Sequence, residues 1–391
     1  MAKTMPQYRK THRIDCIVGA RPNFMKIAPI LRAFRDTKRC HIRLIHTGQH
    51  YDESMSAVFF DELGIPAPDI NLEVGSGTNT EQTARVMLGL EPLLVADRPD
   101  MLLVVGDVNS TLAAALVASK LLVPLAHVEA GLRSKDRTMP EETNRIITDQ
   151  LSDLLLTTER ESLGRLVREG IAAERVHFVG NVMIDTLYHN LSRARSADDT
   201  IAQLANGTTF ASHASRDGFG LVTLHRPSNV DDSAKLAGFV NALAKISVNL
   251  PLLFALPPRT RARLLAASLD AKLAQPKILL TSPLGYLDMI GLMKGARVVI
   301  TDSGGIQEET TALGVPCLTV RDNTERPITV SEGTNTLVGS SPDALLTAVG
   351  EINGSGGKRG RVPELWDGKA AGRVVRRVLD FLDHQLDQLA A

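Results

Sequence analysis

The sequence predicts an α/β protein made of two Rossmann-like, doubly wound domains that face a cleft, each with a parallel sheet covered by helices. Short, continuous apolar runs alternate with longer helical stretches, which is typical of parallel strands buried on both faces. The chain has 391 residues, too many for one ordinary core. The alternation also relaxes at 192–220 and then starts again. We therefore expect an N-terminal domain at 1–183, a second domain at 184–369 and a final helix at 370–391.

Each expected element follows from its local pattern. In the first domain we expect strands at 14–18, 42–47, 101–105, 122–127, 154–157 and 176–179, with helices at 25–35, 81–95, 110–120, 140–151 and 184–191. The polar stretch 192–220 is expected to be a variable surface segment. In the second domain we expect strands at 221–224, 252–255, 278–280, 297–300 and 316–320, a helix at 308–313 and a loop at 350–360.

Composition excludes several classes of function. Lysine plus arginine and aspartate plus glutamate each number 44, so the zero net charge does not support nucleic-acid or membrane-surface binding. Three cysteines without a CxxC pair argue against a disulfide framework or structural zinc and fit a reducing compartment. The polar N-terminus does not resemble a secretory signal, and no apolar stretch approaches the roughly 20 residues of a membrane helix. We expect a cytoplasmic protein.

The most informative motif follows the apolar run 297–300 and reads Thr301-Asp302-Ser303-Gly304-Gly305-Ile306-Gln307-Glu308-Glu309. A strand, a Ser-Gly-Gly turn and a helix start can hold phosphate, because glycines let the backbone approach the anion and the first helical N–H groups point at it. Glu309, expected in the first turn of that helix, could accept hydrogen bonds from a ribose. An ordinary glycine-rich turn with capping residues is the alternative.

Cationic residues follow other strands. Arg21 and Lys26 flank a helix start after strand 14–18, which suits a diphosphate, although a solvated basic turn is the alternative. His225 begins the matching segment after strand 221–224, and Arg326 lies in a charged loop next to the Ser-Gly-Gly turn.

Three carboxylates, those of Asp107, Glu129 and Glu141, are expected on one edge of the first sheet. Such a cluster is costly unless cations accompany it or it transfers protons. A helix-capping role for Asp107 and a structural ion network with Arg133 and Arg145 remain alternatives. No spacing here resembles a dedicated metal site, and a Mg²⁺ role is a minority possibility. Acids on the first domain and anion-binding groups mostly on the second indicate a nucleotide-sugar enzyme.

The chain resembles the non-hydrolysing UDP-N-acetylglucosamine 2-epimerases. The resemblance extends from the Gly19-Ala20-Arg21-Pro22 turn to the Arg326-Pro327 loop, and its most specific parts are the 301–309 motif, His127-Val128-Glu129-Ala130-Gly131-Leu132-Arg133 and Pro140-Glu141-Glu142-Thr143-Asn144-Arg145. It implies the two-domain fold that many glycosyltransferases share (GT-B), a last helix that packs back on the first domain, and a homodimer. It also implies inversion at C2 of UDP-N-acetylglucosamine to give UDP-N-acetylmannosamine, without a cofactor or a metal.

Site residues carry over from the family by motif. The resemblance implies that the catalytic residues are Asp107, Glu129, Glu141 and His225. It implies that the UDP-sugar is bound by Arg21, Lys26, Met289, Ser303, Gly304, Gly305, Glu309 and Arg326, with Met289 in place of an aromatic ring against uracil. The sequence departs from the family at Pro22-Asn23, where many members have Pro-Glu, and at His225-Arg226-Pro227-Ser228, where the family has His-Arg-Arg-Glu.

Four other functions remain open at this stage. A GT-B glycosyltransferase would need an acceptor groove, often with aromatic or basic patches, and aromatic residues make up only 4% of the chain. A hydrolysing epimerase would use nearly the same residues. An epimerase for a modified UDP-amino sugar, such as a diacetamido uronic acid nucleotide, is the third. A nucleotide-sugar sensor is the fourth, and it would have no use for three carboxylates.

Overall fold

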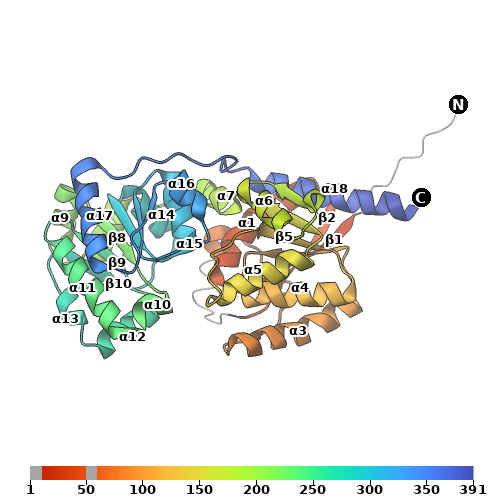
Figure 1. The fold of residues 1–391 in the computed structure, drawn as a ribbon, viewed down its shortest axis with the longest axis horizontal. Coiled ribbons are helices and arrows are strands. Elements are labelled where there is room, and N and C mark those ends of the chain that lie inside the picture. Colours follow the sequence, from red (N-terminus) through yellow and green to blue (C-terminus); the bar gives the residue numbers. More distant parts are fainter. Residues whose placement is uncertain (1–10, 50–59, 391) are drawn as a thin grey trace. The chain divides into compact units, whose positions relative to one another are not determined.

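The computed structural model describes residues 11–49 and 60–390, and the chain divides into two compact units (Figure 1). Unit 1 comprises Met1–Thr186 and Asp367–Ala391, and unit 2 comprises Leu187–Trp366. Each unit is built on a parallel sheet with helices packed against it, which confirms the α/β class that the sequence predicts.

The sheet of unit 1 has the strand order β3-β2-β1-β4-β5-β6-β7 in the described residues, and all its pairings are parallel. Its strands are β1 (His12–Val18), β2 (Cys40–His46), β3 (Ile70–Asn71), β4 (Met101–Val105), β5 (Leu125–Ala130), β6 (Leu154–Thr157) and β7 (Val176–Phe178). Strand β4, at the centre of the sheet, is apolar and buried along its whole length, as expected where helices cover both faces of a sheet.

The helices of unit 1 pack in two groups. They are α1 (Arg21–Thr37), α3 (Asn79–Ala96), α4 (Asn109–Leu121), α5 (Pro140–Leu151), α6 (Glu161–Arg168), the start of α7 (Val182–Asn190), and α18 (Ala370–Ala390), with a 3-10 turn at Ala173–Arg175. Helix α1 packs against α18, whereas α4 packs against both α3 and α5. Right-handed crossovers that run in opposite directions along the sheet place α1 on one face and α4 on the other.

Unit 2 repeats this architecture with the strand order β10-β9-β8-β11-β12-β13, again all parallel. Its strands are β8 (Gly220–Thr223), β9 (Leu252–Ala255), β10 (Ile278–Thr281), β11 (Val298–Thr301), β12 (Cys317–Thr319) and β13 (Asn335–Leu337). Its helices are α8 (Ala197–Leu204), α9 (Phe210–Asp217), α10 (Pro227–Val230), α11 (Ser233–Ser247), α12 (Pro258–Ala266), α13 (Asp270–Leu273), α14 (Tyr286–Gly295), α15 (Gly304–Leu313), α16 (Pro327–Ser331) and α17 (Pro342–Ser355). Buried Phe239 and Phe254 lie in its main core.

Several local predictions need correction. Strand β5 begins at Leu125, not at 122, because Leu122 ends the preceding helix in the left-handed conformation. Helix α15 begins at Gly304, four residues before the predicted start. The polar stretch 192–220 contains helices α8 and α9, and α17 continues to Ser355 into the predicted loop at 350–360. Strands β3 and β13 were not predicted, because each has only two or three residues.

The last helix, α18, belongs to unit 1 and packs on α1. The carboxylate of Asp185 accepts hydrogen bonds from the backbone N–H groups of Ala370 and Ala371, at 3.0 and 2.7 Å, and so caps the start of α18. Arg39 donates to both carboxylate oxygens of Asp383 at 2.8 Å near its other end. None of the helices in the described part of the chain is both long and apolar enough to span a membrane.

Candidate active site

Both sheets have a point where the direction of the strand order reverses, and the predicted site residues follow the strands at these points. The reversal lies between β1 and β4 in unit 1 and between β8 and β11 in unit 2. Ligands of doubly wound sheets bind at such points, beyond the carboxyl ends of the strands. Arg21 and Asp107 follow β1 and β4, while His225 and Ser303 follow β8 and β11. Each unit therefore carries two of these four residues at its reversal point, and of all twelve predicted residues five lie in unit 1 and seven in unit 2.

In unit 1, Glu129 occupies a distorted part of β5. The pairing of β5 with β6 shifts register between Val128 and Ala130, and Glu129 has a φ of 75°. A residue with a side chain rarely adopts this left-handed conformation, which costs about 1–3 kcal/mol and persists where the surroundings enforce it. Bulges of this kind re-aim a side chain and are frequent beside active sites. The strained conformation therefore makes Glu129 a candidate functional residue on structural grounds as well.

The carboxylate of Glu129 is buried and bonded to the ammonium of Lys26. A Cβ atom placed on Gly106 would come within 2.6 Å of Lys26 Nζ and 3.2 Å of Glu129 Oε2, so only glycine leaves room for this pair. The sequence assigns Lys26 to the diphosphate, but the structure gives it Glu129 as its partner. The short-range pattern could not reveal this, because Lys26 and Glu129 are 103 residues apart.

Asp107 follows Gly106 and is paired with Arg145, whose guanidinium also bonds Glu142 at 2.7 Å. The side-chain amide of Asn144 donates to the backbone oxygen of Asp107 at 2.9 Å. Two residues of α5 thus hold the turn after β4. The ion network considered from the sequence exists for Arg145, while Arg133 pairs with Asp149 and Glu169 and with none of the three predicted acids.

Glu141, the third predicted acid, lies half-buried in the first turn of α5. Its side chain makes no hydrogen bond or ion pair with any other residue that the structure describes. Arg145, which binds Asp107, lies one helical turn after Glu141 on α5. Glu141 and the partner of Asp107 therefore lie on neighbouring turns of one helix. The structure therefore places Asp107 directly after Gly106 and the Glu129 carboxylate beside Gly106. Glu141 lies on α5, the helix that supplies the cation bound to Asp107.

Asn23, which the sequence analysis noted only as a departure from the family pattern, holds the turn that carries Arg21. Its buried side-chain oxygen accepts hydrogen bonds from the N–H groups of Gly19 and Ala20, and its amide donates to the carbonyl of Val105 at 2.8 Å. It thereby ties the turn after β1 to the end of β4. Arg21 occupies the first position of α1, which this contact fixes in place. The available signal was a polar residue directly after Pro22, at the third position of the helix.

In unit 2, Ser303 is the N-cap of α15 and Gly304 its first residue. The Ser303 side chain makes no capping hydrogen bond, so the N–H groups of the first turn remain for an anion. A Cβ atom on Gly304 would lie 2.5 Å from Glu325 Oε1. Gly304 is therefore required by the close approach of the 321–326 loop, and Gly305 continues the helix behind it.

His225 is oriented by Asp302, which lies within the glycine motif. Its Nδ1 lies 2.8 Å from Asp302 Oδ1, and Asp302 also accepts hydrogen bonds from the N–H groups of His225 and Arg226 and from the Asn229 amide. Burial acts to raise the pKa of Asp302, but the bonds from His225, Arg226 and Asn229 together hold it below its usual value. The sequence reasoning did not assign a role to Asp302.

Glu309 lies in the second turn of α15, not in the first as predicted. Its buried carboxylate accepts a 2.8 Å hydrogen bond from the hydroxyl of Tyr286, the first residue of α14. Burial and the charge of Glu309 raise the pKa of this hydroxyl, which keeps it a donor. Met289 lies half-buried one turn further along α14. Tyr286 therefore joins the two segments that carry Glu309 and Met289.

Arg326 is nearly buried and bonds Glu308 at 2.7 Å. Next to it, Glu325 is surrounded by three arginines, with Arg321 at 2.8 Å, Arg226 at 3.7 Å and Arg326 at 3.9 Å. Burial acts to raise the pKa of Glu325, but Arg326 and Arg321 hold it well below the usual range. Three arginines therefore gather beside Gly304 at the start of α15.

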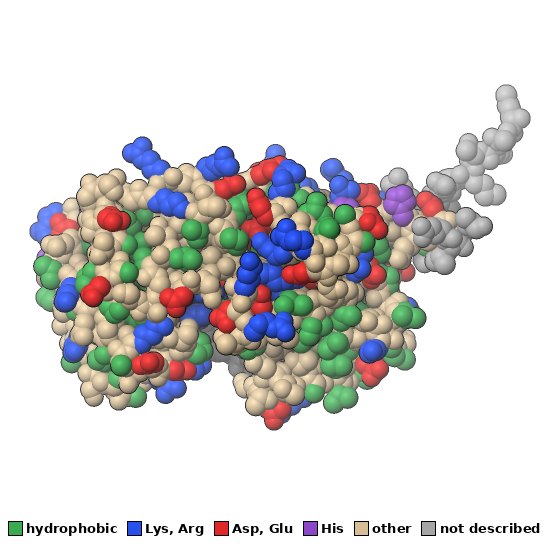
Figure 2. Space-filling view, in the orientation of Figure 1, with side chains coloured by type: hydrophobic (Ala, Val, Ile, Leu, Met, Phe, Trp, Pro, Cys, Tyr) green, Lys and Arg blue, Asp and Glu red, His purple; other side chains and the backbone are tan. Residues whose placement is uncertain are grey.

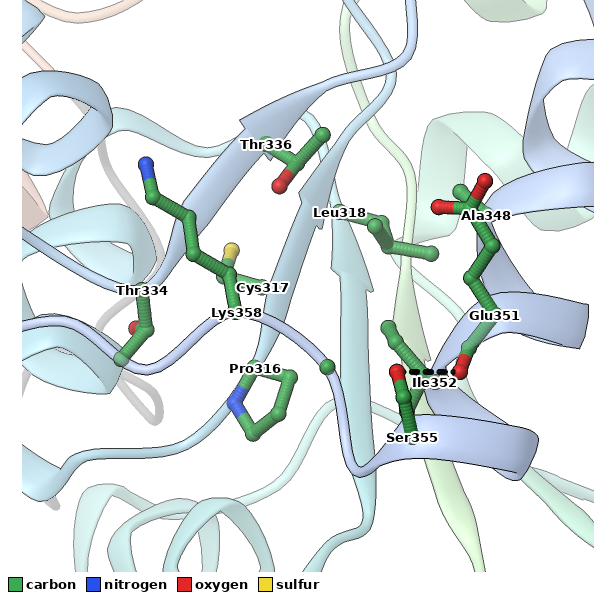
Figure 3. Close-up of a pocket in the computed structure, with 11 residues that line it drawn as sticks. Pro316, Cys317, Leu318, Thr334, Thr336, Ala348, Glu351, Ile352, Ser355 and Lys358 are labelled. Atoms are coloured by element: carbon green, nitrogen blue, oxygen red, sulfur yellow. Dashed lines mark hydrogen bonds between the residues drawn. The ribbon is translucent and has the colours of Figure 1, made fainter.

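A separate cavity of about 270 Å³ in unit 2 is lined by residues from β12, β13, α17 and the segment after α17 (Figure 3). None of the predicted site residues lines it. Within the residues described, no group of three or more histidine, cysteine, aspartate or glutamate side chains is arranged to hold a metal ion.

Comparison with known proteins gives the family. A model of the UDP-N-acetylglucosamine 2-epimerases matches residues 32–379. The UDP-N-acetylglucosamine 2-epimerase of Methanocaldococcus jannaschii is 42% identical over 93% of this chain and 98% of its own. The UDP-2,3-diacetamido-2,3-dideoxy-D-glucuronate 2-epimerase of Pseudomonas aeruginosa is 40% identical over 90% and 98%.

Solved structures agree with these relatives. The crystal structure of the Methanocaldococcus jannaschii UDP-GlcNAc 2-epimerase in complex with UDP-GlcNAc and UDP superimposes with a TM-score of 0.85, at 40% identity, over 94% of this chain and 99% of that one. These matches span nearly the whole sequence, as the motifs predicted. The chain belongs to the UDP-N-acetylglucosamine 2-epimerase family.

Proposed function

We propose that this enzyme interconverts UDP-N-acetylglucosamine and UDP-N-acetylmannosamine by inverting C2 of the sugar. The observation that carries the proposal is the pair of carboxylates at the reversal point of unit 1: Asp107 and a strained, buried Glu129, each bonded to its own cation. The glycine turn and arginine cluster of unit 2 supply the complementary anion-binding groups. Family membership and a relative solved with UDP-GlcNAc and UDP support the same reaction.

The chemistry requires UDP to leave before the C2 proton does, or nearly so. That proton is weakly acidic, because C2 bears an amide nitrogen and no carbonyl. Breaking the C1–O bond sends its electron pair to UDP and gives the ring oxocarbenium character, which acidifies the C2 proton. A carboxylate then takes the proton, and the C1=C2 bond of 2-acetamidoglucal forms. Protonation of C2 from the other face and return of UDP to C1 complete the inversion.

The residues divide between the two partners of this elimination. One set of groups stabilises the departing UDP as its charge grows. This set consists of the first-turn N–H groups after Ser303, together with Gly304, Gly305, Arg326, Arg21 and His225. Glu309 binds the ribose and Met289 contacts the uracil. Asp107, Glu129 and Glu141 stabilise the cationic sugar and move protons, at least two of them on opposite faces of the ring. Lys26 serves as the counter-ion of Glu129.

The second candidate substrate is a UDP-2,3-diacetamido uronic acid. The Pseudomonas aeruginosa relative named for this sugar is nearly as similar to the chain as those named for UDP-N-acetylglucosamine. The same elimination would serve, since C2 carries an acetamido group in both sugars.

One experiment separates these readings. The purified protein is incubated in D₂O with each UDP-sugar in turn and followed by proton NMR. Deuterium at C2 of UDP-N-acetylglucosamine together with new UDP-N-acetylmannosamine signals is the expected result. Exchange confined to the diacetamido uronic acid nucleotide would select the second candidate. Free N-acetylmannosamine would indicate a hydrolysing enzyme, and no exchange with any of them would overturn the proposal.

We further propose that the enzyme is a homodimer formed through the outer side of α3. Leu88 and Val95 are 73% and 66% exposed, and Glu91 is the sole charged residue between 86 and 96. Hydrophobic side chains gather over the region of α3 and α4 (Figure 2). Exposed apolar surface of this kind usually marks an interface. The cysteines Cys16, Cys40 and Cys317, none of them in a disulfide, support the expected cytoplasmic location.

Light scattering after size exclusion tests the dimer. The wild type should have twice the mass of one chain, and Leu88→Asp with Val95→Asp should halve it. Leu265→Asp is the matched control, because Leu265 is 58% exposed on α12 of unit 2. A monomeric wild type, or a dimer that survives the double change on α3, would contradict this interface.

A further inference from the structure

Two buried side chains of unit 1, His127 and Asp149, have no part in the reaction proposed above. Both are fully buried. His127 lies on β5 two residues before Glu129, and Asp149 lies near the end of α5. A charged pair inside a core is costly to desolvate and needs a compensating role.

Asp149 holds the backbone on the far side of the strained Glu129. Its Oδ2 accepts a 3.1 Å hydrogen bond from the N–H of Gly131 and lies 2.7 Å from Arg133 Nη1. Gly131 has a φ of 80°, so the left-handed backbone recurs just after Glu129. The carbonyl of Gly131 is held in turn by Arg165. The distorted segment of β5 is therefore fixed from both sides by side chains of α5 and α6.

His127 connects the same carboxylate to the segment that carries Asp107. Its Nδ1 lies 2.7 Å from Asp149 Oδ1, and its Nε2 lies 2.8 Å from the carbonyl oxygen of Gly106. Gly106, with a φ of 69°, directly precedes Asp107. Both ring nitrogens therefore face acceptor oxygens, one from the side chain of Asp149 and one from the backbone of Gly106.

The buried carboxylate of Asp149 has a basic side chain beside each of its two oxygens. Asp149 faces His127 and Arg133, and Arg133 also bonds Glu169 at 2.6 Å. Burial acts to raise the pKa of Asp149, but His127 and Arg133 hold it below its usual value. Asp149 therefore stays ionised and can accept all of its hydrogen bonds at once.

We propose that Asp149 and His127 are positioning residues that set the placement of the Asp107 carboxylate relative to that of Glu129. A single chain of hydrogen bonds runs from the backbone of Gly131 through Asp149 and His127 to the backbone of Gly106. This inference rests on the proposed function, in which two proton-transfer groups must address opposite faces of one ring. A misplacement of about 1 Å can lower a rate about 100-fold.

Three variants remove different hydrogen bonds of the series that runs from Gly131 to Gly106. Asp149→Asn keeps one acceptor oxygen, so it must lose either His127 or the Gly131 and Arg133 donors. His127→Asn places an amide nitrogen where Nδ1 was and keeps only the bond to Asp149, whereas His127→Gln places it where Nε2 was and keeps only the bond to Gly106. Asp15→Asn is the matched control, because Asp15 is also fully buried and paired with an arginine, Arg43, in unit 1.

The measurements are kcat, UDP affinity by calorimetry, and release of free UDP and 2-acetamidoglucal by NMR. We expect Asp149→Asn to lower kcat about 100-fold and each His127 variant about tenfold, with glycal released, because the acid that should reprotonate C2 is displaced. UDP affinity should stay within about twofold. Asp15→Asn should lower stability without changing kcat per folded molecule or releasing glycal.

Normal kcat in Asp149→Asn, or equal losses in Asp149→Asn and Asp15→Asn without glycal release, would overturn the inference. If Asp149→Asn does not fold, normal kcat in both His127 variants would overturn it equally. A wild type that neither epimerises nor exchanges C2 would overturn the proposed function, and this inference with it. An active wild type with unimpaired variants would overturn the inference alone.

Discussion

The two reversal points use charge in opposite ways. At that of unit 1, Glu129 and Asp107 are each bonded to their own cation, Lys26 and Arg145. At that of unit 2, three arginines gather around Glu325 and Glu308. Paired carboxylates are held in place by their cations, whereas a group of arginines beside the start of a helix favours the approach of an anion. The difference indicates which partner of the elimination each unit handles.

The backbone differs in the same sense. Glu129 keeps its side chain in a left-handed conformation, so strain there serves to aim a functional group. Gly304 has no such conformation, and its missing side chain instead makes room for Glu325. One unit distorts a strand around a carboxylate, and the other removes a side chain so that the backbone itself can be approached.

The largest expected effect on activity comes from removing a carboxylate of unit 1. Glu129→Gln should lower kcat by about 100-fold or more, the usual size of a general acid–base contribution. UDP affinity should change little, because the main UDP-binding groups proposed lie in unit 2. Steady-state kinetics with calorimetry of UDP binding checks both. A near-normal kcat, or an equal loss of UDP affinity, would contradict the assignment of proton transfer to unit 1 and UDP binding mainly to unit 2.

A smaller effect is expected from the anion-binding half. Arg326→Ala should weaken UDP binding about 10- to 100-fold, the value of a hydrogen bond to a charged group, while kcat at saturation changes less. Arg361→Ala is a suitable control, since this arginine is exposed and pairs only at the surface with Glu332. Unchanged UDP affinity in Arg326→Ala would show that the positive charge serves structure alone.

A glycine substitution tests the close approach directly. Gly304→Ala would put a Cβ atom 2.5 Å from Glu325 Oε1 and displace the loop that carries Arg326. We expect UDP affinity to fall about 5- to 10-fold. Nothing lies within 4 Å of a Cβ on Gly350 in α17, so Gly350→Ala should leave affinity and fold intact. Calorimetry that finds the two variants alike would contradict the crowding at Gly304.

The smallest expected effect is a difference in pH dependence between two buried carboxylates. Burial raises the pKa of Asp185 to about 6, above its usual 3.8. Because the pKa of this carboxyl is higher in the folded state than in the unfolded state, its contribution to stability is complete below the unfolded-state pKa. That contribution is lost as the pH rises through the folded-state pKa. The melting temperature of Asp185→Asn relative to that of the wild type should therefore rise by about 2–4 °C as the pH is raised from about 4 to about 7.

Asp302 should behave in the opposite way, because its pKa lies below 3.8. Its contribution is complete above that value and is lost only as pH falls further, so Asp302→Asn should gain on the wild type only in acid. Melting curves of both variants over this pH range provide the check. Parallel curves for the two variants would mean that their surroundings do not differ as described.

Much of this protein follows from local sequence pattern. Continuous apolar strands, helical spacing and glycine turns are properties of neighbouring residues, so the class of fold, most strand positions and the 301–309 motif could be predicted. The boundary errors at β5 and α15 arose where apolar Leu122 ends a helix and where glycines begin one. Neither boundary follows from the intrinsic preference of the residue, since leucine rarely adopts a left-handed conformation and glycine is a poor helix former.

Only the tertiary structure decided which charges meet. Lys26 and Glu129 are 103 residues apart, Asp302 and His225 are 77 apart, and Tyr286 reaches Glu309 from another helix. No periodicity encodes such pairs, because each depends on the strand order that brings distant turns to one edge of a sheet. The strain at Glu129 and the chain through Asp149 and His127 likewise arise from packing and not from the residues alone. The sequence by itself determined the parts and their order, and the folded sheet decided which of them act together.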